Sequence, residues 1–167
     1  GYTTDGTGYM RAVSDAGHTI IGKKMTLLGS GGASTSVFVQ AALDGVSEIS
    51  IFSRRSSRFN ERTKHIISEL KDYSSCNIRL FDMEDTARLR QEIAESAILT
   101  NGTSVGMAPN TDQSVINDSS LFHKDLIVSD IIYNPRETTL MKLAKGAGCP
   151  TFNGLYMLLY QGAEAFQ

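Results

Sequence analysis

The sequence has no tryptophan, and its 167 residues include only three prolines and two cysteines. Because Cys76 and Cys149 lie far apart, we expect buried free thiols rather than a disulfide framework or a metal site. No apolar run is long enough to cross a bilayer, and no secretion signal opens the chain. These absences favour a protein of the reducing cytoplasm with no membrane partner.

The sequence also lacks a large charge excess of either sign. Its formal net charge of -2 argues against a general nucleic-acid-binding protein, because such proteins carry a basic excess. The three histidines have no metal-ligand spacing, and no nucleophile, base and acid form a recognisable catalytic pattern. A hydrophobic fraction of 41% suits one domain with a substantial core, which we expect to span residues 1–167.

Apolar segments alternate with helical patterns along the whole chain. Strands are predicted at 25–28, 49–52, 77–81, 97–100, 126–132 and 150–152. Helices are predicted at 5–16, 34–44, 57–73, 85–95, 137–147 and 155–166. Because such alternation builds parallel sheets, we predict an α/β fold with a doubly wound, mainly parallel sheet and helices on both faces. The irregular stretch 107–123 is expected beside the binding cleft.

A glycine-rich turn at 29–34 joins the first strand directly to a helix. Gly29 permits a sharp turn, and Gly31 lets the backbone approach a pyrophosphate closely. The amide groups that begin the helix then face the anion. Although Ser34 stands where a third glycine often stands, and a lone glycine turn needs no ligand, the flanking strand and helix favour a dinucleotide site. The contacts expected from this turn are Gly29, Ser30, Gly31, Gly32 and Ala33.

The end of the second strand bears on which dinucleotide is bound. An acidic residue there would favour NAD, but this chain has Ser53, Arg54 and Arg55, followed by Arg58. Guanidinium groups bind a 2′-phosphate through paired hydrogen bonds, and cations are unfavourable at a helix start unless an anion is near. The alternative is three solvated side chains. We expect these four residues to bind NADP, with use of NAD left open.

Polar residues follow the later strands as well, and the carboxyl ends of parallel strands line one cleft. Asn101 and Thr103 offer donors and acceptors to a ribose or a nicotinamide amide, or else form a polar turn. Tyr133 either touches a ligand or holds a loop. On sequence alone Asp5 is a helix N-cap, and Gln161 is either satisfied by backbone or reaches a ligand.

Taken in order, these stretches resemble the shikimate dehydrogenase family, including its quinate/shikimate dehydrogenase branch. The stretches that carry the resemblance are Gly1–Gly6, Leu28–Ser34, Ser53–Arg55, Asn101–Met107, Asp130–Pro135 and Gly154–Ala163. They cover essentially the whole chain and imply a Rossmann-like, NAD(P)-binding domain. Two departures stand out: Thr3 replaces the usual asparagine, and Arg55 with Ser56 fits neither the common NADP pattern nor the acidic pattern of dual-cofactor relatives.

The resemblance implies the reversible reduction of 3-dehydroshikimate to shikimate by NADPH, in aromatic amino-acid biosynthesis, or the matching quinate reaction. It implies that Asp5 is the catalytic carboxylate, paired with a lysine of an N-terminal substrate domain that we expect outside this chain, which would leave the fragment inactive. Tyr133 and Gln161 would contact substrate. The further cofactor contacts are Val105, Ile131, Gly154 and Met157.

Two other functions stay open at this point. A non-catalytic NADP-sensing or interaction domain would keep the same fold. A different two-domain NADP oxidoreductase, such as a folate-linked or glutamyl-type reductase, is disfavoured by the Thr-Asp-Gly and Gln-Gly-Ala segments. The expected partner is a small-molecule substrate, shikimate, 3-dehydroshikimate or quinate, with a homodimer as an option for the full-length protein.

Overall fold

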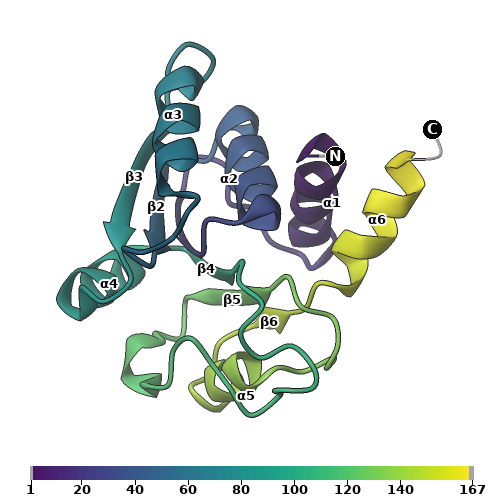
Figure 1. The fold of residues 1–167 in the computed structure, drawn as a ribbon. Coiled ribbons are helices and arrows are strands. Elements are labelled where there is room, and N and C mark those ends of the chain that lie inside the picture. The colour runs from purple at the N-terminus through teal and green to yellow at the C-terminus, as the bar shows by residue number, and fades with distance from the viewer. Residues whose placement is uncertain (1, 166–167) are drawn as a thin grey trace.

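The computed structural model describes residues 2–165, with side chains from residue 5 to residue 160 (Figure 1). The strands are β1 (Lys24–Leu28), β2 (Glu48–Ser53), β3 (Asn77–Asp82), β4 (Ile98–Asn101), β5 (Ile127–Asp130) and β6 (Thr151–Phe152). The helices are α1 (Tyr2–Asp15), α2 (Gly32–Asp44), α3 (Asn60–Leu70), α4 (Thr86–Ala94), α5 (Thr139–Gly146) and α6 (Leu155–Ala165), with a 3₁₀ turn, η1 (Ser119–Leu121).

The strands form one sheet in the order β3-β2-β1-β4-β5-β6, and neighbouring strands pair in parallel. Helices α1, α2, α3 and α6 lie on one side of the sheet, and α4 and α5 lie on the other (Figure 1). The strand order reverses between β1 and β4: β2 and β3 extend the sheet on one side of β1, and β5 and β6 extend it on the other side of β4. The predicted doubly wound, Rossmann-like fold is confirmed.

Two apolar clusters hold the helices to the sheet, one on each face. Along β1, Leu27 belongs to the cluster with Phe38 of α2, whereas its neighbour Leu28 belongs to the cluster with Ile93 of α4. All four side chains are fully buried. Because adjacent strand residues point to opposite faces, a central strand that is buried on both sides must be apolar at nearly every position. The continuous apolar strands seen in the sequence are therefore those of the sheet centre.

Several predicted boundaries shift by a few residues, and three of these shifts bear on the site. Helix α1 begins at Tyr2, so Asp5 lies in its first turn and the N-cap expected there is wrong. Helix α3 begins at Asn60 rather than residue 57, because the Asn60 amide donates to the carbonyls of Arg54 and Arg55 and closes a loop before the helix. Strand β5 ends at Asp130 rather than residue 132, and the Asp130 carboxylate accepts a hydrogen bond from the backbone N–H of Ile132.

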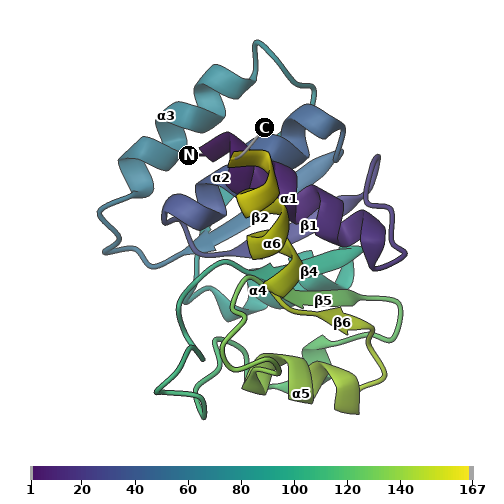
Figure 2. The same cartoon turned by 90° about the vertical axis from the view of Figure 1, so that its right-hand side faces the viewer.

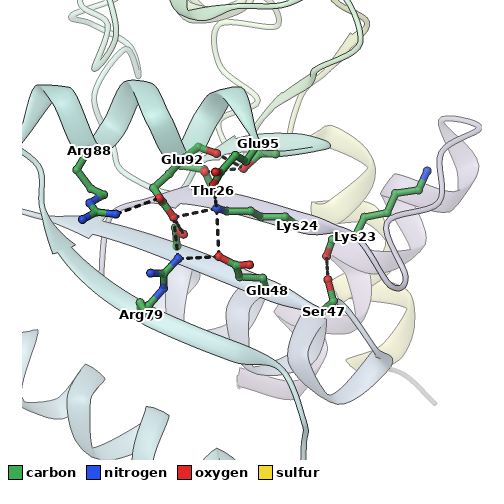
Figure 3. Close-up of polar contacts among 11 residues, drawn as sticks. Lys23, Lys24, Thr26, Ser47, Glu48, Arg79, Arg88, Glu92 and Glu95 are labelled. Atoms are coloured by element: carbon green, nitrogen blue, oxygen red, sulfur yellow. Dashed lines mark hydrogen bonds and ion pairs between the residues drawn. The ribbon is translucent and has the colours of Figure 1, made fainter.

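A partly buried ionic cluster joins the amino-terminal ends of β1 and β2 to α4 (Figure 3). The Lys24 Nζ lies 2.9 Å from the Glu92 carboxylate and 3.1 Å from that of Glu48. Arg79 of β3 reaches the same two carboxylates at 3.1 Å and 2.7 Å, and the Ser50 hydroxyl donates to Glu92. The cluster lies at the amino-terminal ends of the strands, opposite the cleft at their carboxyl ends. It therefore holds α4 in place without entering the cleft.

Candidate functional site

A cleft lies at the carboxyl ends of the strands, beside the reversal between β1 and β4. It consists of two cavities of about 560 Å³ and about 450 Å³, which share walls at Gly31 and at residues 102–104. We call the larger one the β2 lobe, since Ser53, Arg54 and Phe59 line it. We call the smaller one the β5 lobe, since residues 131–134 line it. This shape suits an elongated ligand with one end in each lobe.

The glycines of the turn are there for two different reasons. Gly29 has a φ of +104°, and a Cβ on it would lie 2.8 Å from the Thr103 side chain, so the protein itself requires glycine at this position. Gly31 has an ordinary φ of -73°, and nothing lies within 4 Å of where its Cβ would be. Because no part of the described protein needs a glycine there, the open space above Gly31 is room for a ligand.

The start of α2 offers that ligand a positive pole. Gly31 is the N-cap, no side chain caps the helix, and its first turn contains no acidic residue. Several amide groups of a helix's first turn lack partners within the helix, and the helix dipole adds partial positive charge. This end of α2, bordered by both lobes, therefore suits a phosphate or diphosphate.

Ser34, the departure from a third glycine, has a structural use. Its hydroxyl donates to the Gly102 carbonyl at 3.0 Å and so fastens α2 to the loop after β4. Gly102 provides the space, because a Cβ there would lie only 1.9 Å from the Ser34 hydroxyl oxygen. The pair keeps the shared wall of the two lobes in place.

A chain of hydroxyl groups forms one wall of the β2 lobe. The Ser30 hydroxyl is hydrogen bonded to those of Ser53 at 2.8 Å and Ser57 at 3.1 Å, and Ser53 also donates to the Asn60 amide oxygen. None of the residues that line this lobe is acidic. The negative wall that would favour an unphosphorylated ribose is therefore missing from the described lobe.

The three predicted arginines take different positions. Arg54 lines the β2 lobe. The Arg58 guanidinium lies 4.9 Å from the centre of the Phe59 ring, which also lines the lobe. Arg55 is 88% exposed and forms an ion pair at 2.8 Å with Asp82, at the end of β3. Of the three, only Arg54 lines the lobe; Arg58 contacts the lining residue Phe59, and Arg55 is paired with Asp82.

Sequence reasoning missed a fourth arginine, which contacts two residues of the β2-lobe lining, Ser30 and Phe59, without lining the lobe itself. Arg62, in the first turns of α3, donates from Nη2 to the Ser30 carbonyl at 3.3 Å and to the Thr35 hydroxyl at 3.2 Å. Its guanidinium lies 4.5 Å from the centre of the Phe59 ring. The helix predicted at 57–73 would have placed residues 58 and 62 on one face, but α3 begins only at Asn60, so Arg58 lies in the loop before it.

The loop after β4 is organised by the buried side chain of Asn101. Its amide donates to the carboxylate of Asp130 at 3.1 Å and to the Val105 carbonyl, and its oxygen accepts from the backbone and hydroxyl of Thr103. These bonds use both ends of the Asn101 side chain within the protein. Thr103 lines both lobes and Val105 lines the β2 lobe, so a direct ligand contact is better placed at these two residues.

Asp130 is a buried carboxyl group at the floor of this region, and sequence patterns do not show that its pKa is shifted. Its side chain is only 2% exposed and accepts from Asn101, from the Ile132 N–H and from the Thr138 hydroxyl. Burial raises the pKa of Asp130 to about 6, although these hydrogen bonds act in the opposite direction. The group couples the loop after β4 to the wall of the β5 lobe.

The residues predicted near a nicotinamide or substrate divide into two groups. Ile131 and the half-exposed Tyr133 line the β5 lobe, together with Gly32 and Ala33. Gly154 lies behind this wall: a Cβ there would lie 1.8 Å from the Ile131 carbonyl oxygen. Met157 is 7% exposed and packs in the core, so its contact with a cofactor stays a prediction.

Asp5 lies at the start of α1, half-buried, and burial raises its pKa. Its neighbour Gly6 packs α1 tightly on α2, since a Cβ there would lie 2.4 Å from the Ser36 carbonyl. The starts of α1 and α2 therefore lie at the same end of the fold (Figure 2). Asp5 does not line either lobe, and the side chain of Gln161 lies outside the described residues.

Within the part of the chain that the structure describes, no three histidine, cysteine, aspartate or glutamate side chains gather as a metal site. In the same residues, no helix has the length and apolar character needed to cross a membrane. Cys76 and Cys149 are free thiols, as predicted; Cys149 is buried, but Cys76, predicted to be buried too, is only partly so.

Comparison with known proteins shows close relatives along the whole chain, although no family model matches. The chain is 50% identical to a "Shikimate dehydrogenase (NADP(+))" of Listeria innocua, over all 167 of its residues and 57% of that protein. It is 43% identical to a "Quinate/shikimate dehydrogenase" of Escherichia coli, over 99% of this chain and 57% of that one.

A solved structure of a protein with the same kind of name is similar to this chain in fold and sequence. The crystal structure of shikimate 5-dehydrogenase from Listeria monocytogenes, in complex with shikimate and NAD, matches with a TM-score of 0.94 at 50% identity. The match covers 98% of this chain and 56% of that one. The chain therefore spans a little over half the length of the proteins it matches.

Proposed function

Because this chain is related along its whole length to the shikimate dehydrogenases, we propose that it is the nucleotide-binding half of an NADP-dependent enzyme of that family. The observation that carries the proposal is the two-lobed cleft divided by the glycine turn, with Arg54 and no acidic residue in the lining of one lobe and Arg58 against its residue Phe59. In this assignment the β2 lobe holds the adenosine end of the cofactor and the β5 lobe holds the nicotinamide.

The proposed reaction is the reversible reduction of 3-dehydroshikimate to shikimate, or the matching quinate reaction. NADPH, when bound, supplies the hydride. The chain's own residues bind and orient it: amides at the start of α2 face the diphosphate, Arg54 and Arg58 the 2′-phosphate, and Thr103 and Ile131 the nicotinamide side. Such placement lowers the barrier mainly by holding the reacting carbons together.

Asp5 and Tyr133 are the residues of this half that we assign to the substrate, with Gln161. A half-buried carboxylate with a raised pKa can share a proton with a hydroxyl group at the reacting carbon. A lysine from the rest of the enzyme would complete the pair and would favour the charged form of Asp5. A cytoplasmic location and a homodimer of the full-length protein stay predictions from the sequence and the resemblance.

Titration of the chain with NADPH, followed by nicotinamide fluorescence, tests this function. We expect a saturable signal with NADPH and no oxidation of shikimate when NADP is the acceptor, because this half lacks the substrate domain's lysine. Absence of a saturable signal at millimolar NADPH would contradict the proposal. In the full-length protein, NADPH binding without any turnover of shikimate or quinate would favour the non-catalytic sensing domain instead.

A further inference from the structure

Positive charge at the β2 lobe is not balanced by carboxylates. Among the described residues, Arg54, Arg58 and Arg62 have no carboxylate within 4.0 Å, in contrast to Arg55, which pairs with Asp82. Arg54 lines the lobe, and the guanidinium groups of Arg58 and Arg62 both lie against Phe59, which lines it as well. This unpaired positive charge would favour an anion bound in the lobe.

Arg62 is held firmly enough to act as part of a binding site. Its Nη2 donates only to neutral acceptors, the Ser30 carbonyl and the Thr35 hydroxyl, so these contacts do not neutralise its positive charge. Its Nε is buried and has no hydrogen-bond partner. The guanidinium also rests on the Phe59 ring, which lines the lobe and lies against Arg58 as well. The side chain is therefore positioned before any ligand arrives.

The place of Arg62 points to the phosphorylated ribose rather than to the diphosphate. Ser30, whose carbonyl it contacts, carries the hydroxyl group that is bonded to Ser53 and Ser57 in the wall of the β2 lobe. This wall lies at the end of β2, where a ribose is bound in proteins with this strand order. Arg62 thus contacts the backbone of a residue in this wall, on the side of the cleft where a 2′-phosphate would bind.

We propose that Arg62, rather than Arg55, works with Arg54 and Arg58 to bind the 2′-phosphate of NADP and so determines the preference for NADP over NAD. The proposal rests on the proposed function. A guanidinium that gains a charge-assisted hydrogen bond to phosphate stabilises the complex, whereas the Arg55 charge is already shared with Asp82. NAD has no group at this position, so its binding is expected to be insensitive to Arg62.

The test compares Arg62→Gln with its matched control Arg55→Gln, using calorimetric titrations with NADPH, NADH, adenosine 2′,5′-bisphosphate and ADP. For Arg62→Gln we expect NADPH and the bisphosphate to bind roughly 10- to 100-fold more weakly, with NADH and ADP within about twofold of wild type. Arg55→Gln should leave all four within about twofold. Arg62→Lys, which keeps the charge but loses the fork, should fall between wild type and Arg62→Gln.

Each contrary result has a distinct meaning. Equal weakening of NADPH and NADH by Arg62→Gln would overturn the proposal, since Arg62 would then only support the glycine turn. Unchanged NADPH binding in Arg62→Gln, or a larger loss in Arg55→Gln, would overturn it too. If the wild-type chain binds neither coenzyme, the proposed function itself fails. Thermal unfolding of every variant separates loss of binding from loss of folding, and Arg62→Lys serves if Arg62→Gln does not fold.

Discussion

At the scale of single residues, the cleft depends on the absence of a side chain at two glycine positions. Gly29 is required by its left-handed backbone and by the nearby Thr103, whereas Gly31 is required by nothing that the structure describes. In the sequence both are simply glycines after a strand. Only the three-dimensional contacts separate the glycine that shapes the turn from the glycine that leaves room for a diphosphate.

Substitution Gly31→Asp separates folding from binding. Residue 31 is the N-cap of α2 with extended backbone angles, where aspartate is among the preferred caps and favours the helix. We expect the free energy of unfolding to stay the same or rise by a few tenths of a kcal/mol, roughly the difference between glycine and aspartate caps. NADPH binding should be lost, because the carboxylate occupies the anion position and repels the diphosphate. Denaturant unfolding and NADPH titration measure the two effects, and a variant that still binds NADPH tightly would contradict this role.

Asp130 gives the fold a pH dependence with a definite sign. Its pKa is raised by burial from 3.8 to about 6, so the folded state holds the proton more firmly than the unfolded chain. The stabilising effect of this group is therefore complete below its ordinary pKa and is lost as the pH rises through about 6.

Asp130→Asn removes this titration while keeping the shape of the side chain. The free energy of unfolding of wild type minus that of the variant should fall by up to about 3 kcal/mol between about pH 4 and about pH 7. Urea unfolding at a series of pH values checks this. A difference that stays constant over the range would mean that the pKa of Asp130 is not raised.

At the scale of helices and strands, the alternating pattern of apolar strands and helices predicted the sheet, because a strand buried on both faces has few alternatives. Helix starts were less predictable. Gly6 packs α1 against Ser36 of α2, and the start of α3 depends on the Asn60 amide closing the loop before it. These contacts join residues through the folded chain, so local propensity does not contain them.

The ionic cluster under α4 was also beyond the sequence, since it unites residues from three strands and a helix (Figure 3). Burial alone would raise the pKa of Glu92, but hydrogen bonds from Ser50 and Lys24 and the charges of Lys24 and Arg79 lower it overall. Because the folded pKa is depressed, Glu92 stabilises the fold above its ordinary pKa, and this contribution is lost as the pH falls through the lower folded value.

Glu92→Gln should therefore destabilise the fold by about 3 kcal/mol at neutral pH, because Lys24 and Arg79 lose a charged partner inside the protein. The difference from wild type should shrink below about pH 4. NADPH affinity should change less than about twofold, since the cluster lies at the amino-terminal ends of the strands, away from the cleft. Denaturant unfolding at two pH values and NADPH titration check these outcomes. Stability equal to wild type at neutral pH would show that the cluster contributes nothing.

At the scale of the whole molecule, the strand order places the cleft where the sequence predicted it, at the carboxyl ends beside the central reversal. The glycine turn, Arg54 and Tyr133 all line it. The partners of Arg55 and Arg62 could not be predicted, because they depend on where Asp82 and Ser30 come to lie once the sheet has formed. Sequence patterns thus locate the site but do not assign each charge within it.

The most direct test of the whole account is a crystal structure of the chain grown with NADPH. The account predicts the diphosphate against the amide groups at the start of α2, the 2′-phosphate in the β2 lobe near Arg54, Arg58 and Arg62, and the nicotinamide in the β5 lobe. Electron density for the coenzyme at another place, or a cleft closed by side chains, would contradict it.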